Sequence, residues 1–389
     1  MQPADLIDTG YAPDLPAPMW FIQFFKVLGF SLHAVPMNLW YAGVAVAMLL
    51  CLQRDANGRR LAARLMGQMP VLVAYGVSLG IVPLLFIQVA YAKFFYPATI
   101  LMAWSWFAVV WLLIPAYYGV YAYALGLRSG VMRPWRRAAG WLAAVLFVVI
   151  GLIFANAMSL MADVGRWPAL FEVHNVAGAA TGTALNLAAP SLWPRWLLMF
   201  GLALMTTGAW AAVDAAWLAG KESDDYRRFA RDFAWKLHTA GLLWFAAAGS
   251  WYVFGTWSEA ARAKMLAGPL VFHTALTALS PGLPWLLLWQ LRRRGTDVGR
   301  GLAALAGLAQ FGVLGINAVS RQMVQNIDLR PYFDLIPRGT TVQWSPLLGF
   351  LAMFVLALGV VGWMLVQVLK APAEAAALAD APGGNGGAR

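Results

Sequence analysis

The chain has 389 residues, of which 61% are hydrophobic and only 12% are charged, about half the charged share of ordinary soluble domains. Apolar runs of about 20 residues recur throughout, and one soluble core could not bury them all. The composition therefore excludes a soluble globular protein and predicts an all-α, polytopic membrane bundle. The net charge of +11 does not indicate nucleic acid as a partner, because the basic residues stand in short loops between the apolar runs.

Nine of these runs are predicted to be membrane-spanning helices surrounded by lipid. In chain order they cover Phe21–Leu52, Val71–Tyr91, Thr99–Leu125, Ala138–Met161, Trp196–Leu218, Ala234–Phe254, Pro269–Leu291, Leu302–Val319 and Pro346–Leu369. The first 18 residues carry three aspartates and no Lys or Arg, which is the wrong charge for a cleavable signal peptide. We therefore expect the first helix to remain in the membrane.

The loops between the runs alternate in charge. The loops after spans one, three, five and seven hold, together with the C-terminal tail, 19 basic residues, whereas the other side holds eight. The positive-inside rule places the richer side in the cytoplasm, so the N-terminus is expected outside and the C-terminus inside. Residues 1–370 are expected to form one membrane domain, followed by a disordered cytoplasmic tail over residues 371–389, which is rich in Ala, Gly and Pro.

Two loops on the outer side are longer than a simple connection needs. They are Ala162–Arg195, which is rich in Gly, Ala, Asn and Trp, and Ser320–Ser345, which carries several charges. Long ordered loops on one face often carry function, so these are candidates for docking a partner.

The chain has only four histidines, and three of them lie in or at the apolar spans. His33 and His273 lie in the outer halves of spans one and seven, whereas His238 begins span six near the cytoplasmic surface, where a solvated interfacial role is the simpler interpretation. His174 lies in the first long outer loop. The only cysteine, Cys51, leaves no Cys-x-x-Cys metal site and no covalent haem attachment, so any haem must be held non-covalently.

A methionine and an arginine share the depth of the outer histidines. Met199 lies about four residues into span five, and Arg321 lies at the outer end of span eight. Histidine and methionine are the usual axial ligands of a low-spin haem b, and an arginine could neutralise a haem propionate. A simpler interpretation also exists for each residue type: helix–helix hydrogen bonds, core packing, or extension of the arginine to the interface.

Carboxylates are almost missing from the spans. Asp214 is the only one well inside a span, near its cytoplasmic end. A proton pump or ion-coupled transporter usually needs more such groups, so transport is the weaker interpretation, although Pro83, Pro115 and Pro284 could interrupt helices as transporters do.

Four stretches of the chain, in their order, are similar to subunit I of cytochrome bd quinol oxidases, over roughly residues 20–330. Span one reads Ser-Leu-His-Ala-Val-Pro from Ser31 to Pro36, followed by Gly43. The other three are Leu79–Gln88 with its Gly-Ile-Val-Pro-Leu core, Asn156–Met161 at the end of span four, and Ser320-Arg321-Gln322, which resembles the family's Gly-Arg-Gln. The nine-helix count and the orientation also match this family.

The resemblance implies haem ligands in this chain. His33 matches the histidine of the family's high-spin haem site, and Arg321 matches the arginine beside its low-spin haem. The family's low-spin haem is held by a histidine in span five and a methionine in span seven. The residues at these places are Met199 and His273, with the two types exchanged.

The chain also departs from the family's pattern. Leu85 replaces the glutamate of the second-span motif, span three has no acidic residue, and Met323-Val324 replace Pro-Trp. The outer loop that holds quinol in the family is reduced to Gly255–Gly268. These departures argue against quinol as the electron donor and favour a periplasmic or membrane-anchored cytochrome c.

The sequence as a whole therefore predicts a haem-b-binding subunit of a bd-like respiratory electron-transfer complex in the bacterial cytoplasmic (inner) membrane. It would bind one or more non-covalent haems b, with other haem types open, and pass electrons toward oxygen or another acceptor. A second membrane subunit is the expected partner. The alternatives are a haem-poor anchor or assembly subunit and an unrelated transporter.

Overall fold

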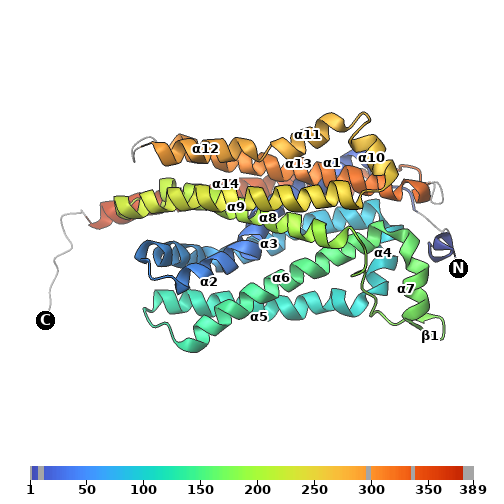
Figure 1. The fold of residues 1–389 in the computed structure, drawn as a ribbon, viewed down its shortest axis with the longest axis horizontal. Coiled ribbons are helices and arrows are strands. Elements are labelled where there is room, and N and C mark those ends of the chain that lie inside the picture. The colour runs from blue at the N-terminus through green and yellow to red at the C-terminus, as the bar shows by residue number, and fades with distance from the viewer. Residues whose placement is uncertain (1, 8–12, 295–298, 334–337, 380–389) are drawn as a thin grey trace.

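A computed structural model describes residues 2–7, 13–294, 299–333 and 338–379. Over these residues the fold is almost wholly helical, and the long helices lie side by side along the longest axis of the molecule (Figure 1). The elements in chain order are η1 (Pro3–Leu6), α1 (Met19–Asn38), η2 (Leu39–Gly43), α2 (Val44–Leu52), α3 (Ala56–Ala90), α4 (Ala92–Leu101), α5 (Ala103–Arg128), α6 (Pro134–Ala162), η3 (Val164–Arg166), α7 (Trp167–Val173), β1 (Asn175–Val176), β2 (Ala179–Ala180), α8 (Leu192–Val213), η4 (Asp214–Leu218), α9 (Asp224–Thr256), α10 (Glu259–Met265), α11 (Val271–Leu279), α12 (Gly282–Arg293), α13 (Gly299–Phe333) and α14 (Trp344–Ala379).

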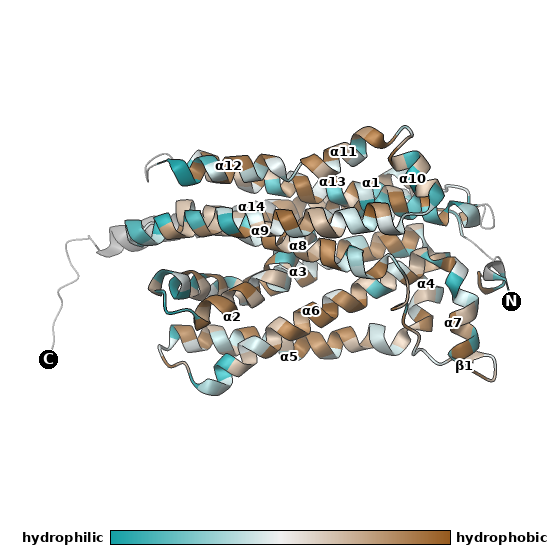
Figure 2. Ribbon diagram, in the orientation of Figure 1, coloured by the Kyte–Doolittle hydropathy of each residue, from teal (hydrophilic) through white to brown (hydrophobic). Residues whose placement is uncertain are grey.

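Eight helices among the described residues are long and apolar enough to cross a membrane, which confirms a polytopic helical bundle. They are Met19–Leu52, Ala56–Ala90, Ala103–Arg128, Pro134–Ala162, Leu192–Leu218, Val271–Arg293, Gly299–Phe333 and Trp344–Met364. Figure 2 shows hydrophobic residues through the middle of the bundle and hydrophilic residues gathered toward its two ends. This distribution suits helices whose middle parts are surrounded by lipid.

The predicted sixth span is the one that is not among these eight. It corresponds to α9, which has 33 residues and is long enough to cross, but carries many charged residues in its first half. Glycines bring α9 against α8: a Cβ added at Gly201 would lie 2.8 Å from the backbone nitrogen of Phe245, and one at Gly208 would lie 2.8 Å from the carbonyl oxygen of Ala234. Such close backbone contact is typical of helices packed in membranes.

The first span contains a π-helical turn, η2, between α1 and α2. All five residues of η2 are buried, and π turns are often found at functional positions. A second π turn, η4, ends α8 at Asp214–Leu218. Neither irregularity is visible in the hydropathy of the sequence, because each keeps the apolar run intact.

The long loop before α8, predicted on the outer side, is folded against the end of the bundle. Its short hairpin, β1 and β2, turns through Ala177 and Gly178, both of which have positive φ, as a type I′ turn requires. The backbone N–H of Asn186 donates to Oδ1 of Asn156 at 2.8 Å, which ties the loop to the end of α6. Asn156 therefore has a structural role in holding this loop.

The second long outer loop differs from its prediction. Residues 320–333 continue α13 instead of forming a loop, so Arg321 lies within a 35-residue helix, twelve residues before its end at Phe333. The prediction stopped at Val319 because the next turns are polar, yet their polar side chains bond to neighbouring helices. Residues 334–337 of this segment lie outside the described residues.

The prolines interrupt the helices less than the sequence suggests. The helices α3 and α5 continue through Pro83 and Pro115. The break falls at Ser280–Pro281, between α11 and α12, just before Pro284. At the C-terminus, α14 runs to Ala379, so residues 371–379 of the predicted tail are helical, and residues 380–389 lie outside the described residues.

Candidate functional site

A cavity of about 300 Å³ lies among α8, α9, α11 and α13, with part of α6 in its wall. Most of the lining is apolar or aromatic, including Phe245 and Trp257. The polar minority includes Arg195 and Arg321 but no carboxylate among the described residues. An apolar pocket with a few convergent polar groups is the usual form of a cofactor or ligand site.

Arg321 is the most informative residue in this cavity. Its Nη1 lies 3.6 Å from the sulfur of Met199, and its guanidinium carbon lies 4.7 Å from the ring centroid of Phe30. Within the part of the chain that the structure describes, it has no ion-pair partner. A half-buried guanidinium that faces an apolar space without a carboxylate is costly unless an anion joins it.

Met199 lines the same cavity, and its sulfur faces the charge of Arg321. His273 is half-buried on α11 and is not part of the lining, although Thr274 and Thr277 of the same helix are. The Nε2 atom of His273 is buried and has no hydrogen-bond partner in the described structure. An unpartnered ring nitrogen beside a cavity is available to a ligand.

His33 lies elsewhere. Its Nδ1 is 2.7 Å from the carbonyl oxygen of Gly76, so Nδ1 carries the proton and Nε2 keeps its lone pair. Gly80 leaves space for the ring, because a Cβ there would lie 2.9 Å from Cε1 of His33. This arrangement orients the imidazole as metal-binding histidines are oriented. His33 does not line the cavity that Met199 and Arg321 share, but the Phe30 ring lies near both residues: its centroid is 6.4 Å from that of the His33 ring and 4.7 Å from the guanidinium carbon of Arg321.

His238 is not the solvated interfacial residue that its position in the sequence suggests. Its side chain is buried, and its Nε2 lies 3.3 Å from Oε1 of Gln310. Gln310 in turn donates to Oγ1 of Thr206, which also accepts from Asn38. The residue was misplaced because α9 begins ten residues before the predicted span, which puts His238 well inside the bundle. His174 remains in the outer loop, within 3.0 Å of Oγ1 of Thr183.

Lys26 is a polar residue of the first span that the sequence analysis overlooked. Its ammonium group donates to Oε1 of Gln322 at 2.6 Å and lies 4.6 Å from the centroid of the Tyr91 ring. Gln322 also donates to the Tyr91 hydroxyl at 2.6 Å. One lysine inside an otherwise apolar run is itself a signal that could have drawn attention to this cluster.

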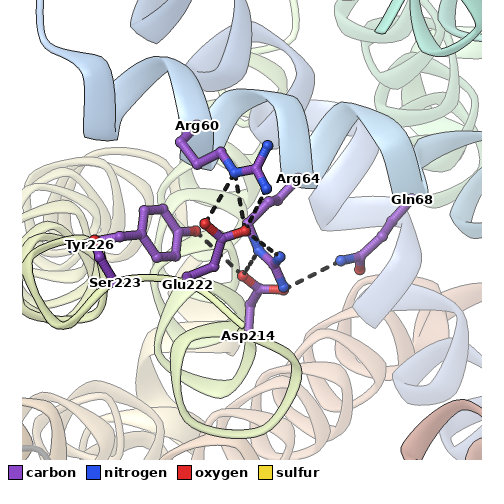
Figure 3. Close-up of polar contacts among 7 residues, drawn as sticks. All are labelled: Arg60, Arg64, Gln68, Asp214, Glu222, Ser223 and Tyr226. Carbon is purple, nitrogen blue, oxygen red and sulfur yellow. Dashed lines mark hydrogen bonds and ion pairs between the residues drawn. The ribbon is translucent and has the colours of Figure 1, made fainter. Parts of the chain in front are cut away.

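The best-satisfied polar cluster lies where α3, η4 and the turn before α9 meet, and is shown in Figure 3. Asp214 is fully buried and accepts two hydrogen bonds from Arg64, at 2.6 and 2.9 Å. Gln68 and Tyr226 donate to the same carboxylate at 3.3 and 3.4 Å. The buried position of Asp214 agrees with its prediction. Its partner Arg64 falls in the loop between the predicted spans one and two, but in the structure it lies in the third turn of α3 and points inward (Figure 3).

Glu222 extends this cluster toward solvent. It lies in the turn before α9 and accepts hydrogen bonds from Arg60 at 2.7 and 2.9 Å, with Arg64 at 3.1 Å. The bonds from Arg60, with the charges of both arginines, lower the pKa of Glu222 below its ordinary value of 4.5. With every carboxylate oxygen paired, the cluster of Figure 3 joins α3, η4 and α9, and its role is structural.

No known protein-family model and no curated protein sequence matches this chain. The site must therefore be interpreted from its own geometry.

Proposed function

We propose that this protein is a haem-b-binding electron-transfer subunit of a respiratory membrane complex, with a haem site in the cavity beside Met199 and Arg321. The observation that carries the proposal is that an arginine with no carboxylate partner among the described residues and a methionine sulfur meet, 3.6 Å apart, at the wall of a mostly apolar cavity. A haem is apolar over most of its surface, anionic at its propionates, and ligated by soft or imidazole donors.

The residues present fit such a group. Arg321 and Arg195 would receive the propionates, and Met199 would supply one axial ligand. The unpartnered Nε2 of His273 would supply the second after a side-chain adjustment toward the cavity. When bound, haem supplies one-electron redox chemistry, and the protein sets its potential through the axial ligands and the nearby positive charge.

His33 is proposed as the ligand of a separate haem. Its oriented imidazole, with Nδ1–H donating to Gly76 and Nε2 unprotonated, supports this role. His33 faces α3 and does not line the first cavity, so its haem would be a second one, with the Phe30 ring lying near both His33 and Arg321.

The proposed topology has nine spans, with α9 as the additional one, an outside N-terminus and a cytoplasmic C-terminus in a bacterial inner membrane. The basic turns before α3 and between α5 and α6 lie at the end of the bundle where α14 ends, whereas η1, α7 and α10 lie at the other end (Figure 1). This asymmetry supports the orientation through the positive-inside rule. The folded loop with α7 offers an outer surface for a cytochrome c, and a second membrane subunit is the expected partner.

The first experiment is a dithionite-reduced minus air-oxidised spectrum of the purified protein, with pyridine haemochrome quantification. We expect a b-type signal with a low-spin component. Met199→Leu and His273→Gln should each abolish the low-spin component while the protein still inserts. Met205→Leu is the matched control, because Met205 lies on the same helix, is buried against Leu202 and Phe245, and does not line the cavity.

Arg321→Leu should lower the midpoint potential of this haem, because removing a nearby cation disfavours the reduced form, whereas Arg321→Lys should retain most of the wild-type value. A CO-sensitive component that disappears in His33→Ala would support the second haem. Absence of haem from the wild-type protein would overturn the redox proposal and leave an anchor subunit or a transporter, whose broken helix would be α11–α12.

A further inference from the structure

A second cavity, of about 430 Å³, lies between the α10–α11 segment and the last turns of α13. The helix α10 in its wall lies at the same end of the bundle as η1 (Figure 1). Its lining divides into a basic part, Lys264 and Arg330, and an apolar part that includes Leu270, Ile327 and Phe333. Among the described residues, no carboxylate lines it, so the cavity is both amphipathic and positively charged.

The two cations have no competing partner in the described part of the chain. Neither Lys264 nor Arg330 forms an ion pair or a side-chain hydrogen bond there. The α13 wall is held in place, because Oδ1 of Asn326 accepts a hydrogen bond from Gln322 at 2.8 Å and another from the hydroxyl of Tyr91. A cation on each of the two walls, Lys264 on α10 and Arg330 on α13, with no acid in the described lining, is arranged to receive an anion.

The position of the cavity near the end of a span, and the apolar surface of α11 beside it, indicate that the anion is the headgroup of a lipid. The cavity adjoins the last turns of α13, where a span reaches the headgroup region. From Leu270, the helix α11 runs away from it toward the middle of the bundle. Phe272, Leu276 and Leu279 are 78%, 39% and 74% exposed, and their spacing of four and three residues places them on one side of α11. This apolar stripe would contact a hydrocarbon chain.

We propose that this cavity binds the phosphate headgroup of an anionic phospholipid, with one acyl chain along the stripe Phe272–Leu276–Leu279. Lys264 and Arg330 receive the phosphate, and Leu270 lies between the headgroup and the chain. A soluble anion would use the two cations only, whereas a lipid uses both parts of the lining. This site is separate from the haem cavity, so it does not depend on the proposed electron transfer.

Native mass spectrometry of the full-length protein, delipidated in detergent, tests the proposal. The probes are dioleoylphosphatidylglycerol, dioleoylphosphatidylcholine and inorganic phosphate. We expect one phosphatidylglycerol to bind with clear preference over phosphatidylcholine. The variant Lys264→Gln/Arg330→Gln should raise the dissociation constant about thirtyfold, from about 1 kcal/mol for each basic residue near a membrane surface. Arg262→Gln is the matched control, an exposed cation on α10 that does not line the cavity.

A second variant separates the lipid from a free anion. Phe272→Ser/Leu279→Ser, which leaves both cations in place, should weaken phosphatidylglycerol binding and leave any phosphate binding unchanged. Circular dichroism should be the same for all variants. Equal binding of phosphatidylglycerol to the wild type and to the Lys264/Arg330 double variant would overturn the proposal. Binding of inorganic phosphate with no preference between the two lipids would overturn the lipid assignment.

Discussion

Replacing Asp214 tests the cluster that joins α3, η4 and α9. In Asp214→Asn the side chain keeps its size, but two donors of Arg64 would face an amide instead of a carboxylate. The Asp214 side chain is 0% exposed and that of Arg64 is 18% exposed, so solvent cannot compensate for the lost charge. Breaking such a pair from one side costs about 3–5 kcal/mol. Because Glu222 remains 3.1 Å from Arg64, we expect the lower end, about 3 kcal/mol.

The more exposed pair of the same cluster, Arg60 and Glu222, serves as a comparison for the buried pair. Arg60 is 58% exposed where it meets Glu222, so Arg60→Gln should cost about 1 kcal/mol or less. The double replacement Arg64→Met/Asp214→Leu removes both buried charges and should cost clearly less than the two single replacements added together, because neither charge is then left unpaired.

Reversible unfolding in mixed detergent micelles, titrated with sodium dodecyl sulfate and followed by tryptophan fluorescence, measures these free energies. The chain has 20 tryptophans, which makes the signal strong. A loss below about 0.5 kcal/mol for Asp214→Asn, within the range of ordinary surface substitutions, would refute the assignment of Asp214 as a structural anchor. If Arg60→Gln lowered the free energy of unfolding as much as Asp214→Asn, the argument that burial makes the Arg64–Asp214 pair the stronger one would be refuted.

Two further predictions use the same unfolding assay. Because the folded-state pKa of Glu222 is lowered, its pairing stabilises the protein above pH 4.5, and this stabilisation is lost as the pH falls through the lowered pKa. Glu222→Gln should remove this part of the acid dependence of the unfolding free energy. An unchanged pH profile in the variant would contradict the prediction. Gly80→Ala should destabilise the protein by about 1–3 kcal/mol, because the added Cβ would meet the His33 ring at 2.9 Å. Gly67→Ala, where no atom lies within 4 Å of the added Cβ, should be neutral or slightly stabilising. Equal effects of the two substitutions would contradict the packing of His33 against α3.

The membrane-spanning helices could be predicted from the sequence because lipid leaves the backbone few choices. Without water to satisfy its peptide groups, an apolar run must form a helix, and hydropathy alone locates it. The predicted start of the first span, Phe21, lies two residues from the observed Met19. Where helices leave the apolar region the prediction failed, as in α13, whose polar turns after Val319 are held by neighbouring helices.

The candidate site divides in the same way. Depth along a helix can be counted from the sequence, and it placed Met199 and Arg321 at one level, where the structure sets them 3.6 Å apart. Which helices face each other cannot be counted, because it depends on side chains from distant segments packing together. Only the tertiary structure therefore leaves His33 out of the lining of this cavity, buries His238 against Gln310, and pairs Arg64 with Asp214 across 150 residues of chain.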